Sequence, residues 1–466
     1  MLPCVLPSWP LRIAFCLLFC TLVPLEADPP PRLYTVENYQ VSLQPDFTKQ
    51  RVFGEVSIRL HSLADTAIAA LEFDAGSLVV TSVLEGNVTQ SFERSKSKLF
   101  VVLSRPVNAD EPRTITVRYE AGPAAGLKFF PDQIYTSIPS DWMPCNDVPS
   151  ERATLHLTLT APRNMNAAAS GRLIGTRASG EQTITEWQLD SPADPSLFGF
   201  ALGNFAESTS GNLHILAAGT EIPSSAQILQ STGAAMLYLA ERTGKPYPAQ
   251  IYSQVFIHGD LIRSLASGLT LLPESYAQGL NKQPEDLWLL TAELAHQWYG
   301  VAIVPKDWSN LWLSDGISAY LADAFLGQRF GKQKYQLEVE HSRNIFDQLH
   351  AQGKDRPLSD SDSELTSRQE AEGDLPAHKG ASFLYLVDQQ LGDDAFWQGL
   401  RLYTSNQWSH SATSDDLQKA FDAMNTKSAD ARTPNRKSKS KTKTNPKGLD
   451  HLFDLWVYGI PDPVKR

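Results

Sequence analysis

The chain contains 466 residues, of which 42% are hydrophobic and 20% are charged. These values are ordinary for a soluble globular protein with a substantial core, and the length allows two or three domains. The net charge of −11 argues against binding nucleic acid through a broadly basic surface, because phosphates attract positive charge.

The N-terminus is typical of a secretory signal peptide. Arg12 precedes an apolar run over 13–23, which is shorter than the roughly 20 residues that span a bilayer, and the small residue Ala27 follows. We expect residues 1–27 to be removed and the mature protein to be secreted, periplasmic or extracellular. The alternative is that the segment stays uncleaved and anchors the chain to a membrane. No other segment of the sequence approaches a membrane span.

Residues 32–211 consist of many short stretches in which apolar and polar residues alternate. The stretches G-E-V-S-I-R-L-H-S-L, T-I-T-V-R-Y-E and A-T-L-H-L-T-L-T have the period of two that predicts β-strands, and Gly, Pro, Asn or Asp bound them. Many short strands separated by turns indicate a β-sandwich-like domain.

From residue 212 to residue 466 the period becomes mostly helical. A first helix ends at Gly244, strand-like stretches follow at 251–258 and 267–274, and nearly everything after Pro284 is helical. We therefore predict an α+β fold, in which a β-sandwich-like domain precedes a mostly helical one.

One segment interrupts the helical pattern. Residues 426–447 are rich in Lys, Ser and Thr and contain almost nothing apolar, so they cannot bury a core. We expect a disordered, solvated insertion there. A basic patch for an acidic partner is the alternative.

The stretch T-A-E-L-A-H-Q-W-Y-G at 291–300 has the spacing of a zinc site. A helix over 284–300 would place Ala292, Glu293 and His296 along one side, because positions four apart lie one turn above each other. Two histidines at this spacing can bind one zinc ion while the glutamate between them reaches a metal-bound water. Only the second histidine is present here. The neighbouring face should bury four apolar residues, namely Leu287, Leu290, Leu294 and Trp298.

Further stretches resemble the aminopeptidase N family of zinc peptidases, which are gluzincins. L-W-L-S-D-G-I-S-A-Y at 311–320 is similar to the family's L-W-L-N-E-G-F-A-x-Y segment, and eighteen residues separate His296 from Asp315, as the family's third ligand requires. The resemblance covers the chain from about Tyr34 to Pro461. Its other segments are W-M-P-C-N-D-V-P-S-E-R-A-T (142–154), F-G-F-A-L-G-N-F (198–205), G-K-P-Y-P (244–248) and L-F-D-L-W-V-Y-G-I-P (452–461).

The resemblance implies a β domain packed on a thermolysin-like helical domain, with the peptide lying in the cleft between them. It also implies that the site is damaged. Ala292 replaces the first zinc ligand, and Asp315 replaces a glutamate with a shorter carboxylate. Leu265, within the stretch 262–266, takes the place of the glutamate that holds the substrate's free amino group. Ala377 stands where the family has a tyrosine that stabilises the oxyanion.

Two hypotheses follow from these substitutions. In the first, the protein is an exported, catalytically inactive homologue of zinc aminopeptidases, with Glu293 as a vestigial general base and His296 and Asp315 as vestigial zinc ligands. It would bind no cofactor, and its cleft would hold a peptide or a protein partner. In the second, it is an enzyme. One version is an active or weak aminopeptidase that recruits zinc through His296 and Asp315, with Glu293 as a further donor, to remove residues from peptide N-termini; the other is a hydrolase with relocated chemistry. For His296 itself, we favour an ordinary internal histidine with satisfied hydrogen bonds over a ligand.

Overall fold

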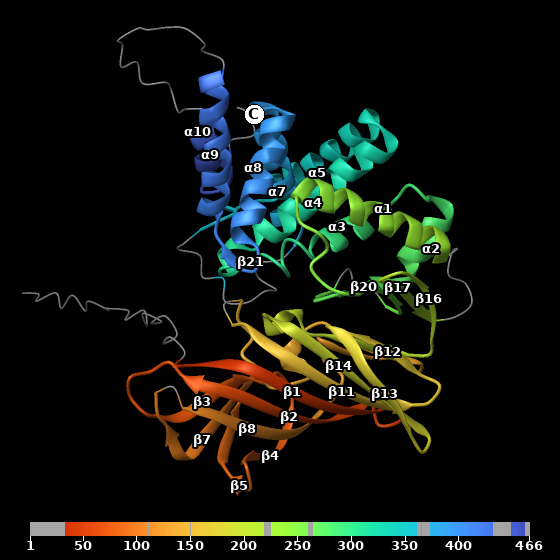
Figure 1. Cartoon of the computed structure of the whole chain (residues 1–466), viewed down its shortest axis with the longest axis vertical. Helices are drawn as coiled ribbons and strands as arrows, with labels where there is room; N and C mark the ends of the chain where they lie inside the picture. Colours follow the sequence, from red (N-terminus) through yellow and green to blue (C-terminus); the bar gives the residue numbers. More distant parts are fainter. Residues whose placement is uncertain are drawn as a thin grey trace, which may run out of the picture.

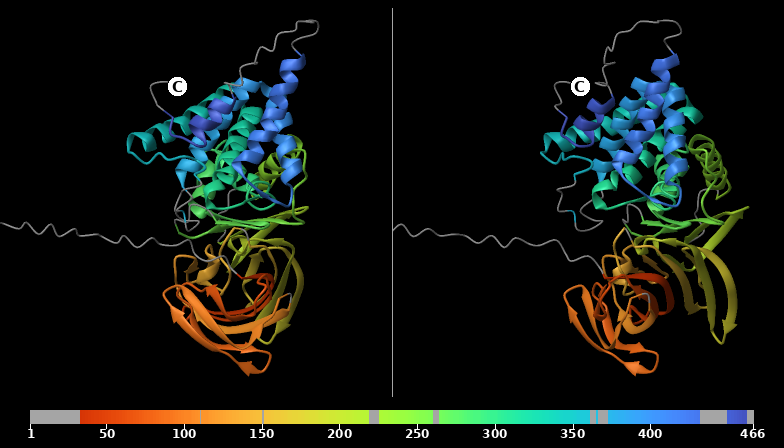
Figure 2. Two further views of the ribbon diagram at one scale, coloured as in Figure 1. Left: turned by 90° about the vertical axis from the view of Figure 1, so that its left-hand side faces the viewer. Right: turned by 60° about the vertical axis from the view of Figure 1, so that its left-hand side comes forward.

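The computed structural model divides the chain into a β-rich part and a helical part that are stacked end to end (Figures 1 and 2). We call the chain from β1 to β15 the β domain and the chain from β16 onward the helical domain. The segment 1–27 lies outside the described residues. The described residues are 33–109, 111–149, 151–218, 225–259, 264–360, 365, 373–431 and 449–461.

An eight-stranded sheet forms the main layer of the β domain. All of its neighbouring strands are antiparallel except β1 and β11, which run parallel. In order across the sheet the strands are β13 (Arg172–Ser179), β14 (Gln182–Ala193), β11 (Ala153–Pro162), β1 (Tyr34–Asp46), β2 (Arg51–Ser62), β8 (Pro112–Ala121), β4 (Val79–Glu85) and β5 (Val88–Thr89).

A second layer closes the β domain. Alternate residues of β1, such as Val41 and Leu43, share one buried cluster with Leu71, Phe73 and Val101 of a three-stranded sheet, as the period of two predicts. That sheet contains β3 (Ile68–Asp74), β7 (Lys98–Val107) and β6 (Ser91–Ser95). A four-stranded sheet contains β12 (Asn166–Ala169), β15 (Phe200–Gly203), β10 (Gln133–Thr136) and β9 (Leu127–Phe129), and the short helices η1 (Pro139–Asp141) and η2 (Pro195–Leu197) lie between strands.

A five-stranded sheet joins the two domains (Figure 1). A small buried cluster packs it against the four-stranded sheet, with Tyr135 and Ala201 on one side and Val255 and Leu271 on the other. Because β16 pairs with β17, the hairpin crosses the boundary expected at 211/212, and the chain enters this sheet at Phe205. The strands in order are β16 (Phe205–Ser210), β17 (Leu213–Ala218), β18 (Tyr252–Ile257), β20 (Leu269–Pro273) and β19 (Ser264–Ala266).

Helices cover the other side of that sheet. The central one, α4, is buried along most of its length and packs on α3, α5 and α7. Gly244 has φ +71° and ends α1 where the sequence predicts. The helices are α1 (Ser225–Thr243), α2 (Glu274–Lys282), α3 (Trp288–Ala295), η3 (Trp308–Asn310), α4 (Trp312–Phe330), α5 (Lys332–Ala351), α7 (Asp374–Leu391), α8 (Asp393–Gln407), α9 (Ser414–Ala431) and α10 (Leu449–Trp456), and β21 (Val304–Pro305) pairs with β22 (Ser411–Ala412).

The α+β fold class is confirmed, and two helix boundaries differ from the sequence pattern. The helix expected over 284–300 is shorter, because α3 begins at Trp288 and ends at Ala295. Helix α9 runs to Ala431, which is inside the segment expected to be disordered from 426, and 432–448 lie outside the described residues. Among the helices that the structure describes, none combines the length and the apolarity needed to cross a bilayer.

Candidate active site

The residues expected to form the metal site come together where α3 ends and α4 begins. Helix α3 carries Ala292 and Glu293, His296 is its C-terminal cap, and Asp315 lies in the first turn of α4. All four are buried, with exposed fractions of 4% for Ala292, 1% for Glu293, 2% for His296 and 1% for Asp315. The spacing in the sequence therefore corresponds to proximity in the fold.

A wide turn after α3 fixes the direction of the chain beyond His296. Three backbone N–H groups bind carbonyls five residues earlier, from Val301 to His296, from Ala302 to Gln297 and from Ile303 to Trp298. Before these bonds, the N–H groups of Gln297 and Trp298 bind carbonyls only three residues earlier, so the regular helical ladder ends although the apolar period continues. The four residues expected in the core, Leu287, Leu290, Leu294 and Trp298, are buried all the same.

Ser314 holds the His296 ring in one orientation. The Ser314 hydroxyl donates a hydrogen bond to the carbonyl of Tyr299 at 2.6 Å, and Nδ1 of His296 lies 3.0 Å from the same hydroxyl oxygen. Because the hydroxyl proton is used on the carbonyl, an N–H on Nδ1 donates to the hydroxyl oxygen, and Nδ1 also lies 3.3 Å from the same Tyr299 carbonyl. Nε2 of His296 then faces Asp315 and lies 3.9 Å from Oδ1 of that carboxylate. Ser314 stands where the family's L-W-L-N-E-G segment has Asn, and a role for this residue was not predicted from the sequence.

Ser314, His296 and Asp315 have the composition of a nucleophilic triad but not its proton arrangement. In a triad the histidine accepts the serine proton, whereas here Ser314 donates to Tyr299 and accepts from His296. The 3.9 Å between His296 and Asp315 is also longer than a hydrogen bond. The arrangement positions the His296 ring and does not activate a nucleophile.

The donors at this site do not fit a catalytic zinc ion. Such an ion takes three protein ligands at about 2.0–2.3 Å and leaves a fourth position for water. His296 and Asp315 supply two, and the methyl group of Ala292 cannot coordinate. Within the part of the chain that the structure describes, no group of three or more His, Cys, Asp or Glu residues is placed to hold a metal.

Leu265 brings an apolar side chain to the neighbourhood of this site. It lies in β19, is 8% exposed and belongs to the core of the β domain. A Cβ atom at Gly300, in the turn after α3, would lie 3.2 Å from its Cδ2 atom. Gln297 fixes β19 from the same turn, because its side chain donates to Ala266 and accepts from Gly268. Of the stretch 262–266, residues 262 and 263 lie outside the described residues.

Ala377 and His378 lie at the start of α7. Ala377 packs against the helical core and offers no hydroxyl. His378 does not replace it, because its Nδ1 atom lies 3.1 Å from the Ser342 hydroxyl on α5 and its ring stacks on Trp288. Burial lowers the pKa of His378 to about 4, against an opposing effect of Asp374, so the ring is neutral at pH 7.

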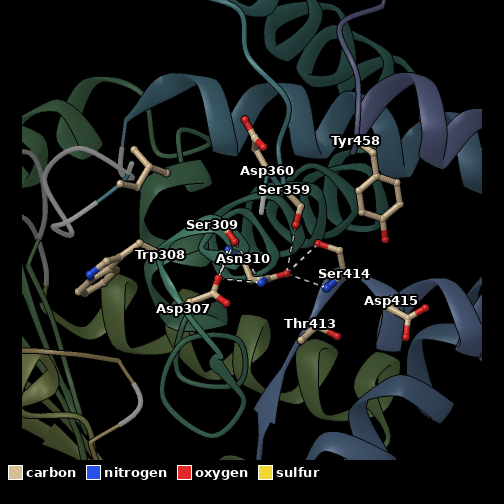
Figure 3. A pocket seen from close by; sticks show the side chains of 11 residues that line it. Asp307, Trp308, Ser309, Asn310, Ser359, Asp360, Thr413, Ser414, Asp415 and Tyr458 are labelled. Atoms are coloured by element: carbon tan, nitrogen blue, oxygen red, sulfur yellow. Dashed lines mark hydrogen bonds between the residues drawn. The ribbon is translucent and has the colours of Figure 1, made fainter. Parts of the chain in front are cut away.

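A polar cavity of about 440 Å³ lies beside η3, and none of the residues expected to form the metal site lines it (Figure 3). Oδ1 of Asp307 accepts from the side chain of Asn310 at 2.8 Å, and Oδ1 of Asn310 accepts from the backbone and the hydroxyl of Ser414. Asp415 forms an ion pair with Lys419. These contacts tie the residues before α4 to the start of α9, which is a structural role.

A much smaller cavity lies between the two domains next to the site. It has a volume of about 10 Å³ and is lined by Pro149 and Asp194 of the β domain and by Gly300 and Ser314 of the helical domain, among others. A cavity of this size has room for about one water molecule.

A sandwich-like β domain packed on a helical domain, with His296 at the end of α3 facing Asp315 in α4, is the two-domain arrangement that the resemblance to the aminopeptidase N family implies. The family comparisons agree. Residues 35–196 match the family model of the peptidase M1 N-terminal domain, and residues 266–455 match that of the peptidase family M1 domain. The chain therefore belongs to the peptidase M1 family, the family of aminopeptidase N.

Individual relatives are distant. Rat (Rattus norvegicus) aminopeptidase N is 26% identical over 310 residues, which cover 60% of this chain and 32% of the rat protein. The chain thus matches about a third of that relative's length. A mutant M1 zinc metallopeptidase from Deinococcus radiodurans is 19% identical and superposes with a TM-score of 0.72, covering 93% of this chain and 96% of that one. The same mutant bound to a Tyr-Ser-Ala substrate gives a TM-score of 0.71 at 20% identity, over 93% of this chain and 96% of that one. At these identities the structural likeness establishes the fold.

Proposed function

We propose that this chain is a non-catalytic member of the peptidase M1 family, exported from the cell, whose interdomain surface binds a peptide or a protein partner. The observation that carries the proposal is the methyl group of Ala292 at the position of the first zinc ligand.

The size of the ligand loss supports this proposal. A full ligand set in structural zinc sites contributes about 10–16 kcal/mol, so each ligand contributes a few kcal/mol. One missing ligand therefore lowers the affinity by about 10³-fold, since about 1.4 kcal/mol corresponds to a factor of ten. The shorter side chain of Asp315 weakens the remaining set further.

Loss of zinc would remove the chemistry that Glu293 serves. In zinc peptidases the ion lowers the pKa of a bound water to about 7, and a glutamate acts as the general base. Loss of one oxyanion donor typically lowers the rate by about 100- to 1000-fold, and Ala377 offers no such donor. Leu265 offers no carboxylate for a free amino group. The effects of these three losses on the rate of hydrolysis multiply.

The competing function is a weak zinc aminopeptidase. It is favoured by the retention of Glu293, His296 and Asp315, and by the orientation of Nε2 of His296 towards Asp315. Two ligands would have to be completed by water or by a donor from elsewhere. The donor count therefore weighs against this alternative.

Hydrolysis of aminoacyl-anilides separates the two functions. We expect the turnover of the wild-type chain, with zinc added, to be more than about 10⁴-fold below that of a complete family member, from the metal and oxyanion losses together. Glu293→Gln is the control, because it removes the general base without changing the shape of the site. Zinc-dependent turnover that Glu293→Gln abolishes would establish the weak aminopeptidase.

The ligand and the export rest on separate observations. The Tyr-Ser-Ala substrate bound to a mutant zinc metallopeptidase of similar fold supports a peptide ligand. Export rests on residues 1–27. Calorimetry with short peptides tests the proposed peptide ligand, and the absence of binding at millimolar concentration contradicts it. Expression of the full chain tests the proposed export, and retention of the protein in the cytosol contradicts it.

A further inference from the structure

His258 lies at the junction of the two domains, directly after β18. Its Nδ1 atom is 2.7 Å from Oε2 of Glu274, the first residue of α2 in the helical domain. Its Nε2 atom is 3.2 Å from Oδ2 of Asp132, in the turn between β9 and β10 of the β domain. One imidazole ring therefore joins carboxylates from both domains.

The two contacts require two donors. A neutral imidazole has one N–H group and one lone pair, whereas an imidazolium has two N–H groups. Carboxylates at neutral pH accept hydrogen bonds and do not donate them. Only the protonated ring can satisfy Asp132 and Glu274 at the same time, and a neutral ring would turn a lone pair towards one of them.

The backbone of His258 is fixed to the β domain as well. Its N–H group donates to the side-chain oxygen of Gln133 at 3.0 Å, and the hydroxyl of Tyr135 donates to its carbonyl at 3.0 Å. Gly259 follows with φ +92°, and a Cβ atom there would lie 3.1 Å from the Phe130 ring. These contacts place the ring at the joint, by which we mean the junction between the two domains. The charge of the ring therefore affects how firmly one domain is attached to the other.

We propose that His258 is a proton-dependent clamp between the β domain and the helical domain. The protonated ring binds Asp132 and Glu274 together, and loss of its proton releases one of them and loosens the joint. Strand β18 pairs with β20, whose other neighbour is β19 with Leu265, so the clamp lies in the sheet that borders the candidate site. The clamp does not depend on whether the protein is catalytic.

The direction of the pH dependence follows from the charges. Burial lowers the pKa of His258, but the hydrogen bonds and charges of Asp132 and Glu274, the charged groups that act on it, outweigh burial and raise the pKa above its usual 6.5. A raised pKa in the folded protein means that the proton stabilises the joint. This contribution is complete below about pH 6.5 and disappears as the pH rises through the raised pKa.

Hydrogen exchange of the intact chain tests the clamp. After correction for intrinsic rates, we expect the amides of β9, β10 and β18 to lose protection by about three- to tenfold between about pH 5.5 and pH 9, the range for two part-exposed ion pairs. His258→Gln should abolish this step. His214→Gln is the matched control, because His214 pairs with Glu207 at 2.7 Å inside one hairpin and joins no domains. If these amides lose as much protection with rising pH in His258→Gln as in the wild type, the proposal is overturned.

A titration gives an independent measurement should His258→Gln fold poorly. Asp132→Asn with Glu274→Gln keeps the shape of both partners and removes their charges. We expect the NMR titration of the His258 ring to move from above 6.5 in the wild type to 6.5 or below in the double variant. An unchanged midpoint would show that these carboxylates do not hold the proton, and it would refute the clamp.

Discussion

Ala292→His combined with Asp315→Glu should raise the affinity for zinc by about 10³-fold or more. The first change supplies an imidazole one helical turn before His296, and the second restores the longer carboxylate. The gain is expected because His296, the ligand that is already present, has a fixed orientation, with Nε2 turned towards Asp315 by the Ser314 hydrogen bond. Competition with a chelator of known affinity measures the change.

A single variant and a triple variant are the controls for this experiment. Asp315→Glu alone leaves two ligands, so its affinity should stay close to that of the wild type. Ser314→Ala in the double variant should lower the restored affinity by about 10- to 100-fold, because the ring of His296 loses its support. A double variant that binds zinc no better than the wild type would show that the helices do not hold the ligands in register.

Zinc alone should not restore full turnover. The double variant still has Leu265 in place of a carboxylate and Ala377 in place of a hydroxyl donor. If zinc returns without hydrolysis of aminoacyl-anilides, these two positions account for the remaining loss.

Gly316→Ala should destabilise the folded chain by about 3 kcal/mol, at the upper end of the range for an overpacked core. Gly316 follows Asp315 in α4, where α4 crosses α7. A Cβ atom there would lie 2.8 Å from the Cα atom of Gly380 and 3.2 Å from the carbonyl oxygen of Pro376. Backbone cannot swing aside as a side chain can, so the two helices must separate. Denaturant unfolding measures the change.

Gly279→Ala is the matched control for the helix crossing. Gly279 is also helical, in α2, and a Cβ atom there would have nothing within 4 Å. Alanine should stabilise that position by up to about 1 kcal/mol, because glycine is the poorer helix former. If Gly316→Ala unfolds at the same denaturant concentration as this control, the crossing is less tight than the structure indicates.

Much of the fold could be predicted because the signals are local. Strand alternation and the end of α1 at Gly244 depend on neighbouring residues, and the structure confirms both. The end of α3 at Ala295 could not be predicted, since the apolar period continues to Trp298 and the wide turn depends on hydrogen bonds made further along the chain. The pairing of β16 with β17 could not be predicted for a similar reason, because a change from strand period to helix period does not show which sheet a strand joins.

The candidate site shows the same division. The resemblance to the family's motifs implied that His296 and Asp315 would lie at one site, and in the structure Nε2 of His296 lies 3.9 Å from Oδ1 of Asp315. Ser314 carries no such signal. The Ser314 hydroxyl donates its proton to the backbone carbonyl of Tyr299 and not to His296. Every residue has such a carbonyl, so the sequence does not indicate which one a serine will bind.

The zinc content of the purified wild-type chain, after dialysis against a mild chelator, tests the incomplete ligand set most directly. Elemental analysis by mass spectrometry should find less than about 0.1 equivalents of zinc per chain, because two donors cannot retain the ion against the chelator. About one equivalent of zinc, lost on His296→Gln, would contradict the proposal that the methyl group of Ala292 has ended metal binding in this protein.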